Sequence, residues 1–186
     1  MTHDIKIEDE LIRLEQAALS HRDAAEEMKQ EFFDNNENVI NGSALYDQMS
    51  FDEWLENTDR NHDPETVRSD WAVATTFFAV RQLDDKILGM IDVRHKLTTP
   101  FLQEYAGHIG YAVRPSERRK GYATRMLKLV LSYCHSLGIF AVRLGCHTDN
   151  KASIRTIERC GGVCIEEKPY LDGNPMAVFQ ISNLKR

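Results

Sequence analysis

The sequence predicts an α+β fold with a largely antiparallel sheet of about six or seven strands, one parallel pair, and helices on both faces. Two observations support this prediction. Apolar, β-rich runs at 71–80 and 87–93 are joined by a polar turn and precede a strand at 109–113, which is typical of an antiparallel meander. A helix at 121–137 and a strand at 140–146 come next. A strand, a helix and a strand in succession normally form a right-handed parallel crossover.

The remaining elements follow from caps and turn residues. Residues 1–10 are mostly polar and are expected to form either a loose extension or a short helical turn. A strand at 11–15 leads to a helix at 20–33, and Ser50 with Glu53 matches a capping box that begins a short second helix. The last predicted elements are a helix at 150–162 and a hairpin of strands at 163–165 and 176–181, with Asp172-Gly173 as its turn.

Composition predicts one globular domain spanning residues 1–186. Hydrophobic residues make up 42% of the chain and charged residues 28%, as in an ordinary soluble protein. The net charge of -6 argues against nucleic acid as a partner. The chain has neither a long apolar run nor a secretion signal, so we expect a cytoplasmic protein that does not bind membranes. Scattered histidines predict no metal site, and the cysteines are expected to be reduced core thiols, namely Cys134, Cys146, Cys160 and Cys164.

The most informative stretch is the turn between the strand at 109–113 and the helix that follows. Residues 116–120 are polar and mostly basic, and Gly121 then begins the helix. The first amides of a helix have no intrahelical partner, and the helix dipole adds partial positive charge there. Gly121 has no Cβ and Ala123 is small, so a ligand can approach closely. The turn is therefore either a pyrophosphate site or a solvated basic loop.

The wider pattern resembles the GNAT superfamily of N-acetyltransferases. Val113-Arg114-Pro115-x-x-Arg118-x-x-Gly121-Tyr122-Ala123-Thr124 is similar to the acetyl-CoA loop of that family, whose core signature is Gln/Arg-x-x-Gly-x-Gly/Ala. Downstream, Asn150-Lys151-Ala152-Ser153 opens a helix that ends at Gly161-Gly162, which looks like the family's next motif. The resemblance implies a GNAT-like fold and direct transfer of an acetyl group from acetyl-CoA to a primary amine of a small molecule or peptide.

The resemblance also implies which residues bind acetyl-CoA. The backbone amide of Val113 would polarise the thioester carbonyl, and its strand edge would bind the pantetheine arm. Asn150 and Ser153 share a helix face and would reach the same arm, although Asn150 alternatively serves only as a helix cap. The positions expected around the pyrophosphate are Arg118, Arg119, Lys120, Gly121, Tyr122, Ala123 and Thr124.

Two catalytic positions depart from the family's pattern. Ile157 stands where many members carry a tyrosine that protonates the departing thiolate, which leaves Tyr170 as the candidate acid. His108 stands where many members carry a glutamate base, and it is either that base or a structural histidine. Further candidate bases are Glu104, then Asp92 and His95.

These departures favour a second hypothesis, a non-catalytic acyl-CoA binding module. A nucleotide-binding protein is disfavoured, because the loop lacks the Gly-x-x-x-x-Gly-Lys-Ser/Thr pattern. The acceptor pocket is expected in the loops at 34–70 and 96–106, whose acidic residues would suit a cationic amine. A homodimer is expected only because several members of the family that the sequence resembles pair through exposed sheet edges.

Overall fold

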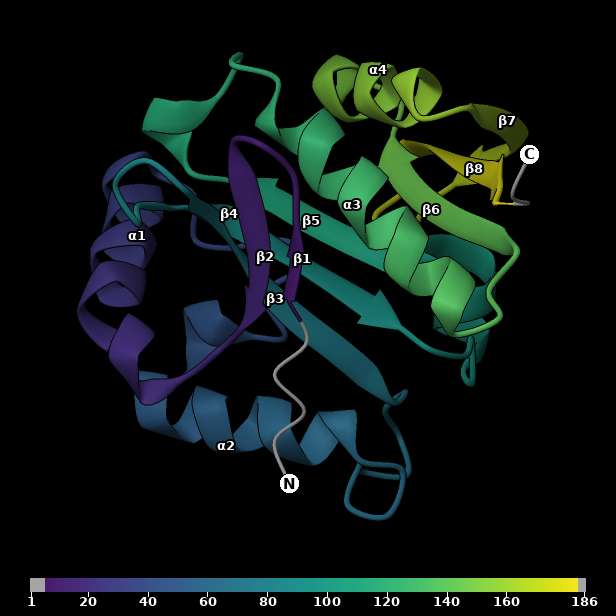
Figure 1. The fold of residues 1–186 in the computed structure, drawn as a ribbon. Helices are drawn as coiled ribbons and strands as arrows, with labels where there is room; N and C mark the ends of the chain where they lie inside the picture. Colours follow the sequence, from purple (N-terminus) through teal and green to yellow (C-terminus); the bar gives the residue numbers. More distant parts are fainter. Residues whose placement is uncertain (1–5, 184–186) are drawn as a thin grey trace.

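The computed structural model describes residues 6–183, which form two antiparallel sheets (Figure 1). The first sheet has the strand order β1-β2-β3-β4-β5, and the second has the order β6-β8-β7. The strands are β1 (Lys6–Glu8), β2 (Ile12–Gln16), β3 (Ala74–Arg81), β4 (Ile87–Arg94), β5 (Ile109–Val113), β6 (Ala141–His147), β7 (Gly162–Pro169) and β8 (Pro175–Ser182).

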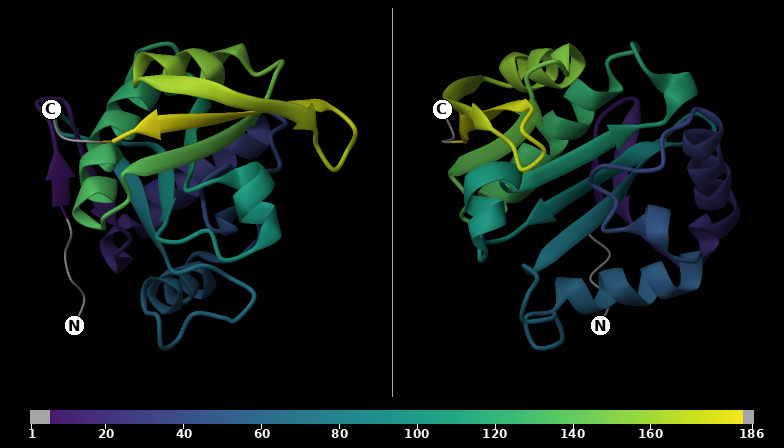
Figure 2. Two further views of the ribbon diagram at one scale, coloured as in Figure 1. Left: turned by 90° about the vertical axis from the view of Figure 1, so that its right-hand side faces the viewer. Right: turned by 180° about the vertical axis from the view of Figure 1, so that it is seen from behind.

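Helices cover both faces of the first sheet, as predicted, and Figure 2 shows the two layers from the side and from behind. Helices α1 and α2 pack on one face, whereas α3 packs on the other and also contacts α4. Within the described residues, no helix combines the length and apolar character needed to cross a membrane. The helices are α1 (Arg22–Asp34), α2 (Phe51–His62), α3 (Tyr122–Ser136) and α4 (Lys151–Arg159).

Strand β3 lies at the centre of the first sheet and is buried on both faces. Successive side chains of a strand point to opposite faces. Accordingly, Phe77 packs in the core beneath α3 with Val130, whereas Phe78 packs in the core beneath α1 and α2 with Trp54. Both phenylalanines are 0% exposed. Burial on both faces explains why this strand reads as a continuous apolar run in the sequence.

The predicted parallel pair is absent. Within residues 6–183, no ladder joins β5 to β6, and the pairing next to them consists of the bridge of Gly107 with Leu144 and a hydrogen bond just before β5. In that bond the His108 amide donates to the Arg143 carbonyl over 2.7 Å. The Arg143 amide donates in turn to Nδ1 of the His108 ring over 3.0 Å. A side chain therefore occupies the place of the next backbone acceptor, and the single mixed sheet expected from the sequence is divided in two.

Three smaller expectations also need correction. The prediction for residues 1–10 is a loose extension or a helical turn, and residues 1–5 lie outside the described residues. Residues 6–8 form strand β1, so for them the prediction is wrong. Strand β7 runs well beyond the predicted 163–165. All four cysteines are free thiols, yet Cys164 is exposed on β7 and Cys160 is only partly buried. Strands β1 and β7 both lie at the edge of a sheet, where burial of one face is incomplete and the apolar pattern in the sequence is weak.

The loop between α1 and α2 lies directly against β5. Gly42 has a φ of +70°, and a Cβ added there would lie 2.1 Å from the carbonyl oxygen of Gly110. Ala44 and Leu45 follow with φ values of 52° and 67°, which are uncommon for residues with a side chain. The glycine therefore permits a backbone contact that brings this loop onto the edge of the site described below.

We expect Gly42→Ala to destabilise the protein by about 3 kcal/mol, because the methyl group adds both a left-handed backbone penalty and a clash. Gly138→Ala is the matched control, since Gly138 also has a positive φ of +76° but has nothing within 4 Å of an added Cβ. It should cost only about 1 kcal/mol. Urea unfolding of both variants measures the difference, and equal losses would contradict the close approach.

Candidate functional site

A cavity of ≈ 310 Å³ lies between the separated strands β5 and β6. Ile109 to Tyr111 form one wall and Leu144 to His147 form the other. The Tyr111 hydroxyl and the Ser153 hydroxyl lie 2.9 Å apart and bridge β5 to α4. Burial raises the pKa of Tyr111 to about 12, so this bridge stays protonated near neutral pH. A further part of the wall comes from Asn150, the N-cap of α4, and from Ser153 and Ile157 of that helix.

Along the edge of β5 that faces the cavity, backbone amides are available to bind a ligand. Successive amides of a strand point to opposite edges. The Arg114 amide donates to Leu88 of β4 over 2.7 Å, so the Val113 amide must point the other way, toward the open edge. The Val113 carbonyl accepts from Nε of Arg118 over 2.9 Å. A polar, extended ligand would therefore meet unpaired strand amides along this edge.

The open edge leads to the N-terminus of α3. The first helical hydrogen bond runs from the Arg125 amide to the Gly121 carbonyl over 3.2 Å, so the preceding amides have no intrahelical partner. Gly121 has a φ of +85°, and nothing lies within 4 Å of a Cβ added to it. Arg119 is exposed and has a φ of 64°. The loop thus presents free amides and an exposed cation to open space, which suits a phosphate group.

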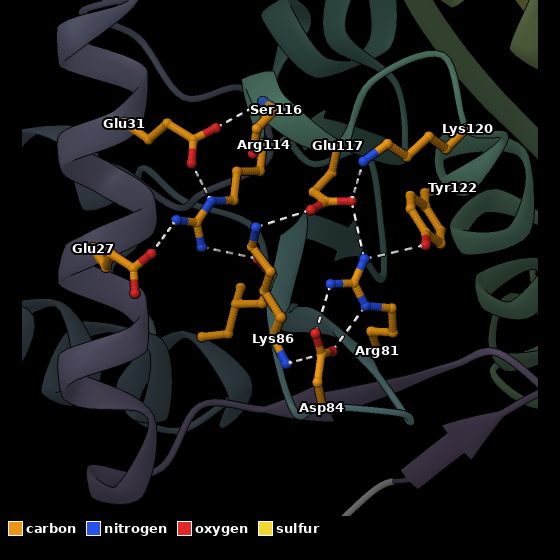
Figure 3. Close-up of polar contacts among 11 residues, drawn as sticks. Glu27, Glu31, Arg81, Asp84, Lys86, Arg114, Ser116, Glu117, Lys120 and Tyr122 are labelled. Carbon is orange, nitrogen blue, oxygen red and sulfur yellow. Dashed lines mark hydrogen bonds and ion pairs between the residues drawn. The ribbon is translucent and has the colours of Figure 1, made fainter.

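A buried carboxylate holds this loop in place (Figure 3). Glu117 has only 4% of its side chain exposed, and it pairs with Arg81 at 3.0 Å, Lys86 at 2.9 Å and Lys120 at 2.9 Å. Burial alone would raise the pKa of Glu117, but hydrogen bonds from Lys120 and Lys86 and the charges of Lys86 and Arg81 lower it to about 2. Three cations, from β3, the turn before β4 and the loop, therefore converge on one anion.

Two arginines fasten the other end of the loop to the region around α1. Arg114, with 4% of its side chain exposed, pairs with Glu27 and Glu31, and the Ser116 amide donates to Glu31 over 2.7 Å (Figure 3). The Arg118 guanidinium binds both carboxylate oxygens of Glu37 at 2.6 and 2.7 Å. Arg118 and Lys120 are therefore held by carboxylates of the protein itself, and the anion-binding groups left over are backbone amides and Arg119.

The candidate catalytic residues from the sequence do not all reach the cavity. Tyr170 lines it, with its ring 5.4 Å from that of Tyr105 and 5.0 Å from that of His147. Neither His108 nor Glu104 is among the lining residues, and Glu104 is exposed. Burial, followed by the charges of two nearby arginines, lowers the pKa of His108 to about 4. The His108 ring is therefore neutral near pH 7, with its proton on Nε2 because Nδ1 accepts from a backbone amide.

A second cavity of ≈ 410 Å³ lies beside the first and is lined by the loop after α1 and by the ends of β3 and β4. Asp92 lines it and is 4% exposed, whereas His95 does not line it. Burial raises the pKa of Asp92. Burial lowers the pKa of His95 to about 4, and its Nε2 lies 2.8 Å from the Thr75 hydroxyl. The residues common to both cavities are Asn41, Gly42, Arg94 and Phe101.

The sequence patterns did not point to several polar residues of these cavities, among them Asn61, Arg94 and His147. His147 ends β6 three residues before the Asn150 cap, so its place at the end of a buried strand was an available signal. Asn61 carries no such signal, because its position depends on how α2 packs. Across residues 6–183, no three His, Cys, Asp or Glu side chains gather as a metal site would require.

Comparisons with known proteins agree with this geometry. The sequence matches the acetyltransferase (GNAT) domain family over residues 13–163. Similar solved structures include the ribosomal-protein-S5-alanine acetyltransferase from Vibrio fischeri, at 18% identity and a TM-score of 0.71, with 97% of each chain covered. The microcin C7 self-immunity acetyltransferase MccE, in complex with acetyl-CoA and AMP, has 17% identity and a TM-score of 0.68 over 94% of this chain and 93% of its own.

A chimera of the spermidine N-acetyltransferase SpeG from Vibrio cholerae with hSSAT has 16% identity and a TM-score of 0.63, with 92% of this chain and 95% of that chain covered. No curated protein matches the sequence. At these identities the structural likeness establishes the fold, whereas the acceptors named for two of the neighbours, a ribosomal protein and spermidine, differ from each other.

We expect Glu117→Gln to lower the free energy of unfolding by about 3 kcal/mol at pH 7, because a pKa lowered from 4.5 to about 2 measures the stabilisation of the charged form. The contribution is fully present above pH 4.5 and is lost as pH falls toward 2. Urea unfolding from pH 7 to pH 3 should therefore show the two proteins converging. Glu104→Gln, at an exposed position, is the control, and a constant gap across pH would contradict the ion-pair account.

Proposed function

This chain belongs to the GNAT acetyltransferase family, and on that premise we propose that it transfers an acetyl group from acetyl-CoA directly to a primary amine of a small molecule or peptide. The observation that carries the proposal is the open edge of β5 beside the N-terminus of α3. A strand edge suits an extended amide-containing arm, and a helix N-terminus suits a pyrophosphate. The complex of MccE with acetyl-CoA and AMP supports acetyl-CoA as the donor.

In this proposal the pyrophosphate lies on the backbone amides at the start of α3, and the pantetheine arm follows β5. The Val113 amide donates to the thioester carbonyl, where negative charge develops during attack. The Asn150 carboxamide oxygen accepts from the Ser153 amide over 3.1 Å, so it caps α4, and its nitrogen remains for the pantetheine arm. The residues proposed around the pyrophosphate are Arg118, Arg119, Lys120, Gly121, Tyr122, Ala123 and Thr124.

The proposed reaction forms a carbon–nitrogen bond as the neutral amine attacks the thioester carbonyl, and the carbon–sulfur bond then breaks. The amine loses a proton and the departing thiolate gains one, so CoA leaves as a thiol. We propose Tyr170 as the proton donor, because it lines the cavity. A thiol has a pKa of about 8.5, so its departure needs little assistance. Of the two roles that the sequence left open for His108, base or structural histidine, the occupied Nδ1 favours a positioning role.

The homodimer and the cytoplasmic location stay predictions. Strand β7 is an outer strand of its sheet, and Val163 and Ile165 on it are 66% and 48% exposed. An exposed apolar strand edge favours pairing with a second copy. This feature supports the dimer prediction, which light scattering over a range of protein concentrations measures directly.

Acetyl-CoA at 100 times its Kd should stabilise the wild-type protein by about 2.7 kcal/mol, and Gly121→Glu should abolish that thermal shift. The substitution places bulk and negative charge where a phosphate would bind. Gly138→Glu is the matched control, because Gly138 lies at the other end of α3 with a similar φ and equally open surroundings. If Gly121→Glu bound acetyl-CoA like the wild type, the loop would not be the pyrophosphate site.

We expect kcat/KM to show no step near pH 6.5 that belongs to His108, since a pKa of about 4 keeps the ring neutral across that range. His108→Ala should lower the free energy of unfolding by about 1–3 kcal/mol, because the Arg143 amide loses its acceptor, while the shape of the pH profile stays the same. Urea unfolding measures the loss of stability, and thiol release from pH 5 to pH 8 measures the pH profile of both proteins. A step in the wild type that vanishes in the variant would identify His108 as the base.

A further inference from the structure

The second cavity contains a buried amide without a partner. Asn61 of α2 is 3% exposed, and among the described residues its Nδ2 atom has no hydrogen-bond partner. Buried donors are nearly always paired in folded proteins, because an unpaired one has lost its bonds to water. Asn61 lines the cavity, so a ligand oxygen there would supply the missing acceptor.

A buried carboxylate lies on the same cavity. The Thr76 hydroxyl donates to Oδ1 of Asp92 over 2.8 Å, and Nε of Arg94 lies 3.3 Å from Oδ2. A carboxylate has about four acceptor positions, so these two contacts leave room for a further donor. Burial raises the pKa of Asp92 despite the charge of Arg94 and the hydrogen bond from Thr76. A cation bound beside this side chain would stabilise the charged carboxylate.

The cavity is also placed next to the proposed thioester site. It shares Gly42 and Arg94 with the cavity between β5 and β6, and the Gly42 backbone touches β5 at Gly110. A ligand bound at Asn61 and Asp92 would therefore lie in the cavity next to the one that borders the open edge of β5. Neither residue belongs to the loop or to the strand edge assigned to acetyl-CoA.

Resting on the proposed acetyl transfer, we propose that Asn61 and Asp92 form the subsite for the head group of the acceptor. The Asp92 carboxylate binds the ammonium group, and Nδ2 of Asn61 donates to a carbonyl or hydroxyl oxygen a few bonds away. The acceptor class is a primary amine with a neighbouring oxygen, as found in an amino-acid amide or at the N-terminus of a peptide. A polyamine offers Asn61 no oxygen and leaves its donor unpaired, so it is the poorer substrate.

The test measures thiol release from acetyl-CoA with three acceptors: alaninamide, alanyl-alanine amide and spermidine. For the wild type, kcat/KM should be at least about 10-fold higher for the better amide than for spermidine. Asn61→Leu should raise KM for that amide by about 10-fold and raise KM for spermidine much less, since spermidine has no oxygen for Asn61 to bind. Asn57→Leu, one turn earlier on α2 and outside the cavity, is the matched control. Asp92→Asn should lower kcat/KM for every amine by about 100-fold while the acetyl-CoA thermal shift persists.

A stability measurement separates binding from structure. Because Asn61→Leu removes an unpaired buried donor, its Tm should rise by about 2–4 °C. Asn61→Ala repeats the test without added bulk if leucine does not fit. A lowered Tm with an unchanged KM for both variants would make Asn61 structural and overturn the proposal. Transfer to spermidine but to neither amide would overturn it too and leave the acetyltransferase function standing, whereas no thiol release with any amine would overturn both.

Discussion

The separation of β5 from β6 is the constraint on which the candidate site depends. Strand β6 packs closely against the segment before β5 where glycine permits it, since a Cβ on Gly145 would lie 1.8 Å from the Tyr105 carbonyl oxygen. Beside that contact, the His108 ring accepts the Arg143 amide that would otherwise continue a ladder. Beyond this point the outward-facing amides of β5 need another partner, because β6 does not pair with β5. The first cavity lies where that pairing is missing.

Charge organises the loop that follows β5. Glu117 and Arg114 are both buried, and each is paired with several opposite charges, which is the arrangement that makes buried ions tolerable. The Glu117 pairs hold Lys120 and connect the loop to β3 and to the turn before β4, and the Arg114 pairs connect it to α1. The loop therefore keeps its shape without a ligand, and a bound phosphate would meet amides that are already oriented, at a lower entropic cost.

Each of the two cavities is lined by a buried polar side chain whose hydrogen bonding is incomplete. The described residues contain two buried side-chain atoms without a partner, Nδ2 of Asn61 and Nδ1 of His147, and each lines a different cavity. The loop between the cavities contains Ala44 and Leu45 in left-handed conformations. Unpaired groups and strained backbone lower stability, and they persist where the surrounding fold enforces them. Their concentration at this place agrees with a site that is completed by two ligands from different sides.

The sequence by itself determined the elements whose signals are local. The hairpin of β3 and β4, the strand, loop and helix around Gly121, the capping box of Ser50 and the Asn150 cap all follow from nearby residues, and the structure contains each of them. Only the tertiary structure decided that β5 and β6 part, that Glu117 gathers three cations, and that Asn61 and Asp92 line one cavity. Those outcomes depend on contacts between residues far apart in the chain and on burial, which neither periodicity nor capping patterns encode.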